Sequence, residues 1–453
     1  MSLGSKLEYF SSTLARAALC MGLAACASDR SPSGKGNGDP EPPPKATWDW
    51  AGVVGTGQSL AVGQNGLPVA STMQPYANLK LSTGTAAWPI DPNDESFELV
   101  PLVEPIGRRS PSYPSSYPTN IAGETPHASM ANQVTALFQA AGGSDYVTVH
   151  GEFGENGQGI ALLKKDAIEG EVNGRAYAAT LLEVTAVKRL ADAAGKTYGI
   201  GAIIVTHGES DAGSATYGAE LHTLWSDYTA DLSAITGQAE KPLMLLSQQN
   251  SVNNRAASTI AAWKLGVEHP EDVVCSGPKY QYPYSSDSVH LVTEGYQLLG
   301  EKYGQVYFER VVRKRNWQPL QPTSVERTSA RVVTVNFHVP VPPLVWETTF
   351  SPPHTDSMFW QNGKGFELRG PLGSITIESV EIAGAAVRIN TTDDLPESGV
   401  FVGYALVETV PPMSEPFVGT KRWGMLRDSD PFVGRMTNKP QPNYAVAFEL
   451  PLP

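Results

Sequence analysis

The stretch WAGVVGTGQSL, residues 50–60, decides the fold. Its mostly apolar first half ends abruptly in a glycine-rich turn, which predicts a short buried strand followed by a tight loop. Such a turn can lift Ser59 clear of the sheet, with its hydroxyl exposed and its own N–H directed into a site, as a nucleophile requires. The motif is weak alone, because most Gly-Ser turns are only turns.

Short apolar runs of the same kind recur as far as about residue 315, and amphipathic helical segments separate them. The expected strands are 50–54, 146–150, 200–206, 243–247 and 273–275. The expected helices are 130–141, 177–194, 217–235, 256–267 and 294–312. This alternation predicts an α/β domain over residues 47–316, a three-layer αβα, flavodoxin-like fold with a parallel sheet. Ligands of such sheets bind beyond the carboxyl ends of the strands.

The segment SDSVHL, residues 286–291, follows the last expected strand. A three-residue separation in a turn can bring the Asp287 carboxylate onto Nδ1 of His290, which leaves Nε2 free to act as a base. The alternative is an aspartate that caps a helix beside a surface histidine. A candidate serine after the first strand favours the catalytic interpretation.

A third polar segment, THGESDA at residues 206–212, follows the strongly apolar strand 200–205. Ser210 and Asp211 are typical helix-capping residues. His207 and Glu209 are not, which indicates a binding or catalytic role for this block.

The three segments together resemble the SGNH (GDSL-like) hydrolase superfamily, and more narrowly its sialate O-acetylesterase and acetylxylan-esterase branch. In that branch G-Q-S, G-E-S-D-A and D-x-x-H motifs recur in this order, and the resemblance covers about residues 48–310. It implies that Ser59 is the nucleophile, His290 the general base and acid, and Asp287 the carboxylate that orients His290. No metal and no organic cofactor is implied.

Two positions depart from the branch. Leu60 stands where an asparagine usually follows the serine, and His207 stands where glutamine or asparagine usually donates to the oxyanion. By resemblance, the oxyanion hole is made by the N–H of Ser59, by His207 through a neutral imidazole N–H, and by a glycine within residues 150–159. The alternative for His207 is a buried structural histidine. We favour Gly157 for this glycine. The alternatives are Gly154 and Gly159.

The substrate pocket is the least specific part of the sequence. Gln58, Glu209 and Tyr284 are candidates for its lining, and the tyrosines of residues 280–284 suggest surfaces on which sugar rings stack. Ordinary loop packing explains these tyrosines equally well. The insert at residues 64–128 has little periodicity and is expected to form loops over the catalytic face.

The pattern changes after Pro319. Alternating apolar and polar residues with frequent turn signals predict an all-β, sandwich-like accessory domain over residues 320–453. The expected strands are 331–338, 374–382, 386–390 and 400–407. No convincing helix and no catalytic constellation is expected here. Three tryptophans are either core residues or a carbohydrate-stacking platform: Trp346, Trp360 and Trp423.

The N-terminal 46 residues have the pattern of a signal peptide followed by a lipidation site and a linker. Residues 1–25 combine a basic start with a short apolar run, as in a signal peptide, and end in Leu-Ala-Ala before Cys26, which looks like a bacterial lipobox. This resemblance implies lipidation of Cys26, and residues 26–46 then form a flexible linker. We expect a secreted bacterial lipoprotein at the outer membrane or cell surface, with the membrane contacted only through the lipid. The alternative is a plain cleaved signal peptide.

Composition limits the possible functions. The 453 residues carry 33 Lys and Arg against 46 Asp and Glu, a net charge of −13, which argues against nucleic-acid binding. Three cysteines give no disulfide framework, and Cys275 is expected to be a buried strand residue. The leading hypothesis is a serine esterase that acts on acylated carbohydrate. The alternatives are an SGNH lipase or thioesterase acting on non-sugar acyl groups, and a non-catalytic glycan-binding surface lipoprotein.

Overall fold

The computed structural model describes residues 41–82, 91–106, 123–170, 174–251, 257–349, 358–406 and 422–453. Residues 43–453 form one compact unit. The predicted signal peptide, Cys26 and most of the predicted linker lie outside the described residues. Within the described part, no helix has the length and apolar character needed to cross a membrane.

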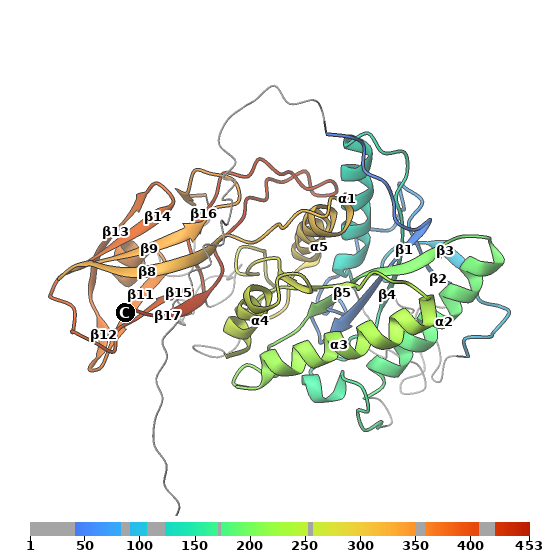
Figure 1. The fold of residues 1–453 in the computed structure, drawn as a ribbon, viewed down its shortest axis with the longest axis horizontal. Helices are drawn as coiled ribbons and strands as arrows, with labels where there is room; N and C mark the ends of the chain where they lie inside the picture. The colour runs from blue at the N-terminus through green and yellow to red at the C-terminus, as the bar shows by residue number, and fades with distance from the viewer. Residues whose placement is uncertain are drawn as a thin grey trace, which may run out of the picture. The chain divides into compact units, whose positions relative to one another are not determined.

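A seven-stranded sheet lies at the centre of the first part of this unit, in the order β3-β2-β4-β1-β5-β6-β7 (Figure 1). Its strands are β1 (Trp50–Gly57), β2 (Leu79–Leu81), β3 (Leu99–Pro101), β4 (Val147–Glu152), β5 (Tyr198–Thr206), β6 (Leu243–Leu246) and β7 (Val273–Cys275). All neighbouring strands are parallel except the edge pair β2–β3. These two strands fall in the insert where only loops were expected, because three-residue strands carry no periodic signal.

Helices cover both faces of the sheet, which confirms the predicted three-layer fold (Figure 1). On one face lie α1 (Pro126–Ala140) and α5 (Thr293–Tyr307), which continues into a π-helical turn, η2 (Phe308–Val312). On the other face lie α2 (Ala176–Ala193), α3 (Tyr217–Thr236), α4 (Ala257–Glu268) and a short 3-10 turn, η1 (Ile160–Leu162). Every residue of β5 is buried, as expected for a central strand packed on two sides.

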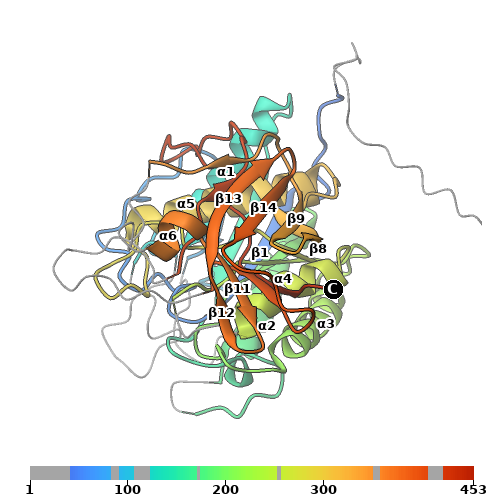
Figure 2. The same ribbon diagram turned by 90° about the vertical axis from the view of Figure 1, so that its left-hand side faces the viewer.

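The C-terminal part is built mainly of antiparallel β-sheets, as predicted (Figure 2). One four-stranded antiparallel sheet contains β12 (Gly373–Ile375), β11 (Phe366–Gly370), β15 (Phe401–Tyr404) and β17 (Phe448–Pro451). The other contains β13 (Ile377–Ala383), β14 (Ala386–Thr391), β9 (Val332–His338) and β8 (Gln321–Ser329). A two-stranded sheet, β10 (Val345–Trp346) with β16 (Leu426–Arg427), and one short helix, α6 (Met358–Gly363), complete the part. The helix was not expected.

The three tryptophans of this part have different environments. Trp423 is buried in the β core, and Trp346 is partly buried against the same core. Both are therefore packing residues and not an open carbohydrate platform. The side chain of Trp360 lies outside the described residues.

Buried contacts join the α/β part to the β part. Gln248, just beyond β6, donates to the carbonyl of Ala447 and accepts from its N–H, both at 2.8 Å. The hydroxyl of Tyr280 donates to the carbonyl of Ala445 at 2.7 Å. Trp263 of α4 and Tyr280 belong to the hydrophobic core of the β part. The two parts therefore share a core.

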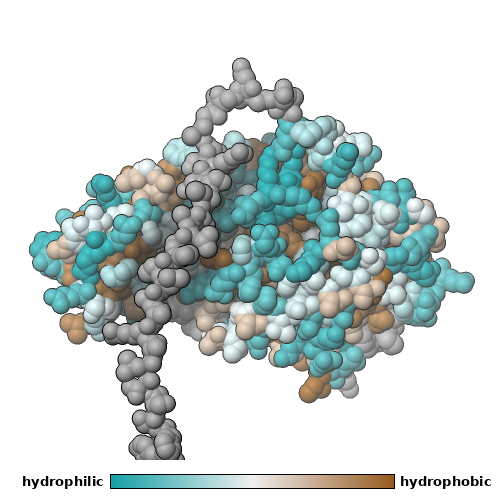
Figure 3. Space-filling view, viewed as in Figure 1, coloured by the Kyte–Doolittle hydropathy of each residue, from teal (hydrophilic) through white to brown (hydrophobic). Residues whose placement is uncertain are grey.

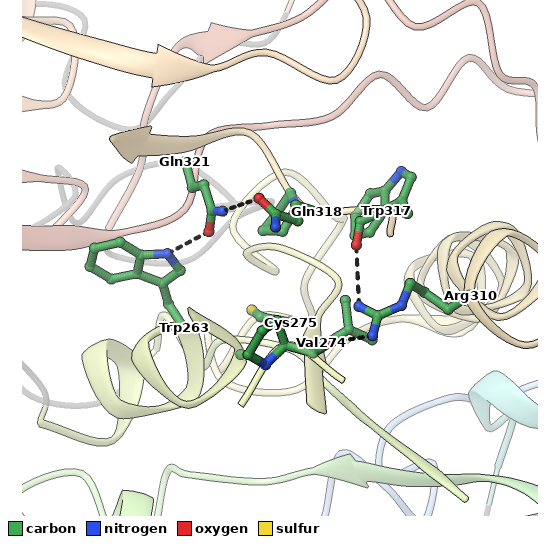
Figure 4. A pocket seen from close by; sticks show the side chains of 10 residues that line it. Trp263, Val274, Cys275, Arg310, Trp317, Gln318 and Gln321 are labelled. Carbon is green, nitrogen blue, oxygen red and sulfur yellow. Dashed lines mark hydrogen bonds between the residues drawn. The ribbon is translucent and has the colours of Figure 1, made fainter. Parts of the chain in front are cut away.

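A small pocket lies at this junction, lined by residues of α4, β7, η2 and the chain that leads into β8 (Figure 4). Its polar groups satisfy one another: the Trp263 indole N–H donates to Gln321 at 2.8 Å, and Arg310 donates to the carbonyls of Pro270 and Trp317. Cys275 is buried, as predicted, and lines this pocket. None of the predicted site residues borders it.

Figure 3 shows that the visible face of the molecule is largely hydrophilic, with hydrophobic residues scattered over it. This distribution is that of an ordinary globular surface.

Candidate active site

Ser59 is placed by the way in which β1 ends. Gly57 has φ +146°, and a Cβ there would overlap the carbonyl oxygen of Thr206 on β5, so the close approach requires glycine. The N–H of Gln58 donates to that carbonyl at 3.3 Å, and the chain then turns, with the N–H of Gln64 donating to the Ser59 carbonyl at 3.0 Å. Ser59 thus lies just beyond the carboxyl end of a central strand and is 4% exposed.

Asp287 and His290 lie in the loop between β7 and α5, beyond the carboxyl end of another strand of the same sheet. Oδ2 of Asp287 is 2.7 Å from Nδ1 of His290. Oδ1 accepts from the N–H groups of Val289 and His290, both at 2.9 Å, and from the hydroxyl of Ser285 at 2.7 Å. The carboxylate therefore both fixes the turn and holds the imidazole, so the structural and catalytic interpretations of this motif are compatible.

The charge state of Asp287 sets the tautomer of His290. Partial burial acts to raise the pKa of Asp287, but the hydrogen bonds from the His290 backbone and ring, from Val289 and from Ser285 outweigh it and lower the pKa to about 2. The ionised carboxylate can only accept, so Nδ1 of His290 carries the hydrogen that it shares with Asp287. In the neutral ring Nε2 is then the nitrogen with a free lone pair.

Three hydrogen bonds tie the turn after Ser59 to the loop of Asp287 and to α5. The side-chain amide Nδ2 of Asn65 is 2.9 Å from Oδ2 of Asp287 and 3.1 Å from the Ser285 hydroxyl. The hydroxyl of Tyr296 on α5 donates to the carbonyl of Gln64 at 2.6 Å. These contacts bring chain segments at least 220 residues apart to one corner of the sheet.

The segment after β4 is the candidate oxyanion loop, residues 153–159. The N–H of Gly154 is committed to the Glu152 carboxylate at 2.6 Å, which excludes it as an oxyanion donor in this geometry. A Cβ on Gly159 would lie 3.2 Å from the Asp211 carboxylate, so this glycine faces a scaffold residue. Gly157 is exposed with φ +73°, and the space beside it is open. Gly157 remains the best candidate of the three.

His207 does not fit the predicted role of oxyanion donor. Its Nε2 is 3.0 Å from the carbonyl oxygen of Gln158, which can only accept, so Nε2 carries the hydrogen. Nδ1 then accepts from the hydroxyl of Tyr217 at 2.9 Å. Burial, the main cause, lowers the pKa of His207, which favours this neutral form. Both nitrogens are thus occupied within the protein, and the imidazole has no N–H left to offer a substrate.

The block after β5 instead supports the candidate oxyanion loop. Besides the bond from His207, the hydroxyl of Ser210 donates to the carbonyl of Gly157 at 3.1 Å. The carboxylate of Asp211 accepts from the N–H of Ile160 at 2.8 Å. The N–H of Ser210 donates to Oε1 of Gln58 at 3.1 Å. Residues 207–211 therefore hold the loop next to the turn that carries Ser59.

The three predicted pocket residues are buried and do not form an open lining. Gln58 is 3% exposed and is used in the bond to Ser210. Glu209 forms a buried ion pair with Lys279, Oε1 to Nζ 3.0 Å. Tyr284 is buried, as are Tyr280 and Tyr282. Of the two alternatives for these tyrosines, the structure supports packing and not a surface on which sugar rings stack.

A buried polar network lies beneath this corner, in α1 and β4. Nδ1 of His127 is 2.9 Å from Nδ1 of His150, and Nε2 of His127 is 2.9 Å from Oε2 of Glu152. Nε2 of His150 is 2.9 Å from the hydroxyl of Thr148, which itself donates to Asn78. His150 must therefore donate from Nε2 and accept at Nδ1, so His127 donates from Nδ1. One further proton is then shared between Nε2 of His127 and the Glu152 carboxylate.

Burial raises the pKa of Glu152 and, with the neighbouring His127, lowers the pKa of His150 well below its usual range. The network is thus a neutral His150 beside a His127–Glu152 pair that holds one proton. Glu152 also fixes the N–H of Gly154, which connects this network to the candidate oxyanion loop.

Sequence reasoning missed Asn65, Gln64, Lys279 and the His127 network. A signal for Asn65 was present, because Asn-Gly at residues 65–66 is a strong turn dipeptide. Lys279 and His127 carry no local signal, since their partners are distant in the chain. Among the described residues, no group of three His, Cys, Asp or Glu side chains is arranged to hold a metal ion.

Comparison with known proteins supports the fold. No protein-family model matches the chain, and no curated protein matches its sequence. A carbohydrate acetylesterase from Xanthomonas citri has a similar structure, with a TM-score of 0.50, 10% identity, and coverage of 88% of this chain and 80% of that chain. Weaker similarities are to a protein from Arabidopsis thaliana (TM-score 0.39, 16% identity, 57% of this chain and 98% of that chain) and to NanS (TM-score 0.36, 11% identity, 59% and 98%).

Proposed function

We propose that this protein is a serine esterase that removes acetyl or other small acyl groups from carbohydrate through an acyl-enzyme. The observation that carries the proposal is the 2.7 Å bond between Asp287 and His290 in a loop that Asn65 ties to the turn of Ser59. A carboxylate that orients an imidazole is the pair that activates a serine hydroxyl, and the bond from Asn65 ties this pair to the turn that carries Ser59.

In the first step, Oγ of Ser59 attacks the ester carbonyl carbon while Nε2 of His290 takes the hydroxyl proton. Asp287 keeps the imidazole in the required tautomer and stabilises the imidazolium that forms. The tetrahedral intermediate then expels the sugar oxygen, which receives the proton from Nε2. The products of this half-reaction are the free sugar hydroxyl and Ser59 esterified by the acyl group.

In the second step, His290 takes a proton from water as the water oxygen attacks the acyl-enzyme carbonyl. The second tetrahedral intermediate then collapses: its bond to Oγ of Ser59 breaks, Oγ receives the proton from Nε2 of His290, and the carboxylic acid is released. Positioned acid–base catalysis of this kind contributes ~10²–10⁴-fold to the rate.

The negatively charged oxygen of both tetrahedral intermediates must be stabilised by hydrogen-bond donors. With His207 occupied, the donors in our proposal are the backbone N–H groups of Ser59 and Gly157, and His207 serves to hold the loop through Gln158. Removal of one such donor typically costs ~10²–10³-fold in kcat.

The similarity of fold to a carbohydrate acetylesterase supports the choice of substrate class. The experiment is acetate release by the mature chain from acetylated xylan, other acetylated glycans and 4-nitrophenyl acetate. We expect turnover by the wild type and loss of at least about 10³-fold in Ser59→Ala, because the nucleophile is removed. Full activity in Ser59→Ala would exclude the proposal.

Acyl-chain length separates the proposed activity from a lipase or thioesterase. We expect 4-nitrophenyl acetate to have a higher kcat/KM than the octanoate and palmitate esters. A preference for long chains or for thioesters would favour those activities. Glycan binding without acetate release from any substrate would favour a non-catalytic lipoprotein.

We further propose that the chain is a surface lipoprotein anchored through Cys26. The support is the sequence alone: a short apolar run that ends in Leu-Ala-Ala-Cys, followed by a spacer rich in serine, glycine and proline. The test is incorporation of labelled palmitate in a bacterial host. We expect labelling of the wild type and none of Cys26→Ser, whereas Cys20→Ser should leave it unchanged.

A further inference from the structure

A row of three side-chain amides connects the candidate oxyanion loop to the carboxylate of Asp287. Nδ2 of Asn156 is 3.4 Å from Oε1 of Gln64. Nε2 of Gln64 is 3.1 Å from Oδ1 of Asn65, and Nδ2 of Asn65 is 2.9 Å from Oδ2 of Asp287. Asn156 directly precedes Gly157 in the chain.

Asp287 dictates the direction of every bond in this row. Its carboxylate is ionised above about pH 2 and can only accept, so Asn65 must turn its NH₂ group toward it. The oxygen of Asn65 then faces Gln64, which must donate from its own NH₂ group. The oxygen of Gln64 is left to accept from Asn156. A reversed amide at any point would place two donors or two acceptors face to face.

Asn65 occupies a position that suits this contact. Its φ of +66° lies in the left-handed region, where asparagine, aspartate and glycine are the residues best tolerated. On Asp287, Oδ1 has three donors from its own loop, whereas the donors on Oδ2 are the His290 ring and Asn65. Asn65 is the donor that comes from the segment carrying Ser59.

We propose that Asn65 is a positioning residue of the Ser59–His290–Asp287 site, and that the Asn156–Gln64–Asn65 row couples the oxyanion loop to the Asp287 carboxylate. This inference rests on the proposed esterase function. Asn65 does not touch the reacting atoms in this scheme. It holds Oδ2 of Asp287 so that the imidazole it orients stays aligned with the Ser59 hydroxyl.

Asn65→Asp is the sharpest variant. It keeps the shape of the side chain, the tolerance of a positive φ and the oxygen that faces Gln64, but it replaces the donor with a charged oxygen against Asp287. Asn65→Gly removes the amide while keeping the backbone relaxed. Both variants lose the hydrogen bond to the Asp287 carboxylate, so the His290 imidazole is less well oriented. We expect kcat to fall by about 10–100-fold in Asn65→Asp and by about 3–10-fold in Asn65→Gly. KM should stay within about twofold in both, because uniform substrate binding is untouched.

The pH profile gives a readout that a merely structural role would not move. Extra negative charge beside Asp287 favours the imidazolium form of His290. The acidic limb of kcat/KM should therefore shift to higher pH in Asn65→Asp, with a smaller shift in Asn65→Gly.

Charged groups of other elements also face this corner. The Glu209–Lys279 ion pair begins at Glu209, which follows β5. Besides burial, the main cause, the negative charges of Glu209 and Asp287 raise the pKa of the Tyr296 hydroxyl. On α5, Glu294 is paired with Lys439. All are retained in the variants, so a shift of the acidic limb reports the change at residue 65.

Asn438 provides the matched control. It is an exposed asparagine with φ +54°, and no side-chain contact of the site involves it. Asn438→Asp and Asn438→Gly introduce the same chemical changes and should leave kcat, KM and the pH profile unchanged.

A double-mutant cycle tests the coupling along the row. Gln64→Ala should lower kcat by about 2–5-fold in the wild type, because it lets the Asn65 amide rotate, and should have no further effect in Asn65→Gly. Wild-type turnover that depends on Ser59, with no change in kcat or pH profile in Asn65→Asp, would overturn the inference while leaving the proposed function intact. Additive effects in the cycle would overturn the coupling. Absence of Ser59-dependent turnover in the wild type would instead refute the proposed function on which the inference rests.

Discussion

Nε2 of His207 lies 3.0 Å from the carbonyl oxygen of Gln158, so the imidazole holds the loop beside Gly157 and does not face a substrate. Its ring also stacks on Tyr217, with centroids 5.6 Å apart. The position that the family resemblance would assign to an oxyanion donor is therefore a scaffold position in this chain.

His207→Phe tests this assignment, because phenylalanine retains the stacking but loses both polar contacts. We expect the free energy of unfolding to fall by about 1–3 kcal/mol, since the buried Tyr217 hydroxyl and Gln158 carbonyl lose their partner. kcat should fall by less than the ~10²–10³-fold typical of a lost oxyanion donor. Denaturant unfolding and aryl-acetate kinetics check both. A loss of kcat in that full range at unchanged stability would contradict the scaffold role.

Asp287→Asn tests the orienting carboxylate. The amide can present its NH₂ group to Nδ1 of His290, which favours the wrong tautomer for a base at Nε2. By analogy with other serine hydrolases we expect kcat to fall by roughly 10³–10⁴-fold with a small change in KM. The matched control is Asp394→Asn, which removes an exposed ion pair with Arg331 and should leave activity unchanged. Near-normal turnover in Asp287→Asn would remove Asp287 from the mechanism.

Glu183, a buried carboxyl of α2, makes stability depend on pH. Burial raises its pKa from an ordinary value near 4.5 to about 8, partly offset by Lys80. The folded state therefore keeps a proton that the unfolded state releases, and this group's contribution to stability falls as pH rises from about 4.5 to 8.

Glu183→Gln abolishes this titration while preserving the shape of the side chain. Its free energy of unfolding relative to the wild type should increase between pH 5 and pH 8, as measured by denaturant unfolding at each pH. Glu326→Gln, at an exposed position of β8, serves as the control and should show no such trend. A pH-independent difference for Glu183→Gln would contradict the raised pKa.

The α/β part should not fold well without the β part. Removal of residues 320–453 would expose Trp263 and Tyr280 and leave the Gln248 side chain without its partners on Ala447. We expect residues 43–316 to be insoluble or rapidly degraded, whereas residues 43–453 should be recovered as soluble protein. A soluble, active fragment 43–316 would show that the shared core is dispensable.

The sequence was sufficient for the layers of the fold and for the placement of the three motifs. Long, strongly periodic elements such as β5 and α3 follow from local pattern alone. The strands β2 and β3 could not be predicted in this way, because three-residue strands within an aperiodic insert leave no periodic signal. The helix predicted over residues 294–312 ends in the π-helical turn η2, because an apolar pattern does not distinguish α-helical from π-helical hydrogen bonding.

The site was less predictable, because its chemistry depends on contacts between distant residues. The position of Ser59 after β1 and the contact between Asp287 and His290 follow from local motifs. The ion pair that buries Glu209 against Lys279, and the hydrogen bonds of His207 with Gln158 and Tyr217, do not. The tyrosines at 280–284 illustrate the same limit: whether an aromatic side chain stacks on a sugar or packs in a core depends on its surroundings, not on its type.

The central claim is that Ser59 is an activated nucleophile, and covalent labelling tests it most directly. The chain is treated with a fluorophosphonate and the modified residue is located by peptide mass spectrometry. We predict modification of Ser59 alone in the wild type, and little or none in His290→Ala. Recovery of Ser59 unmodified under conditions that label a known serine esterase would contradict the claim.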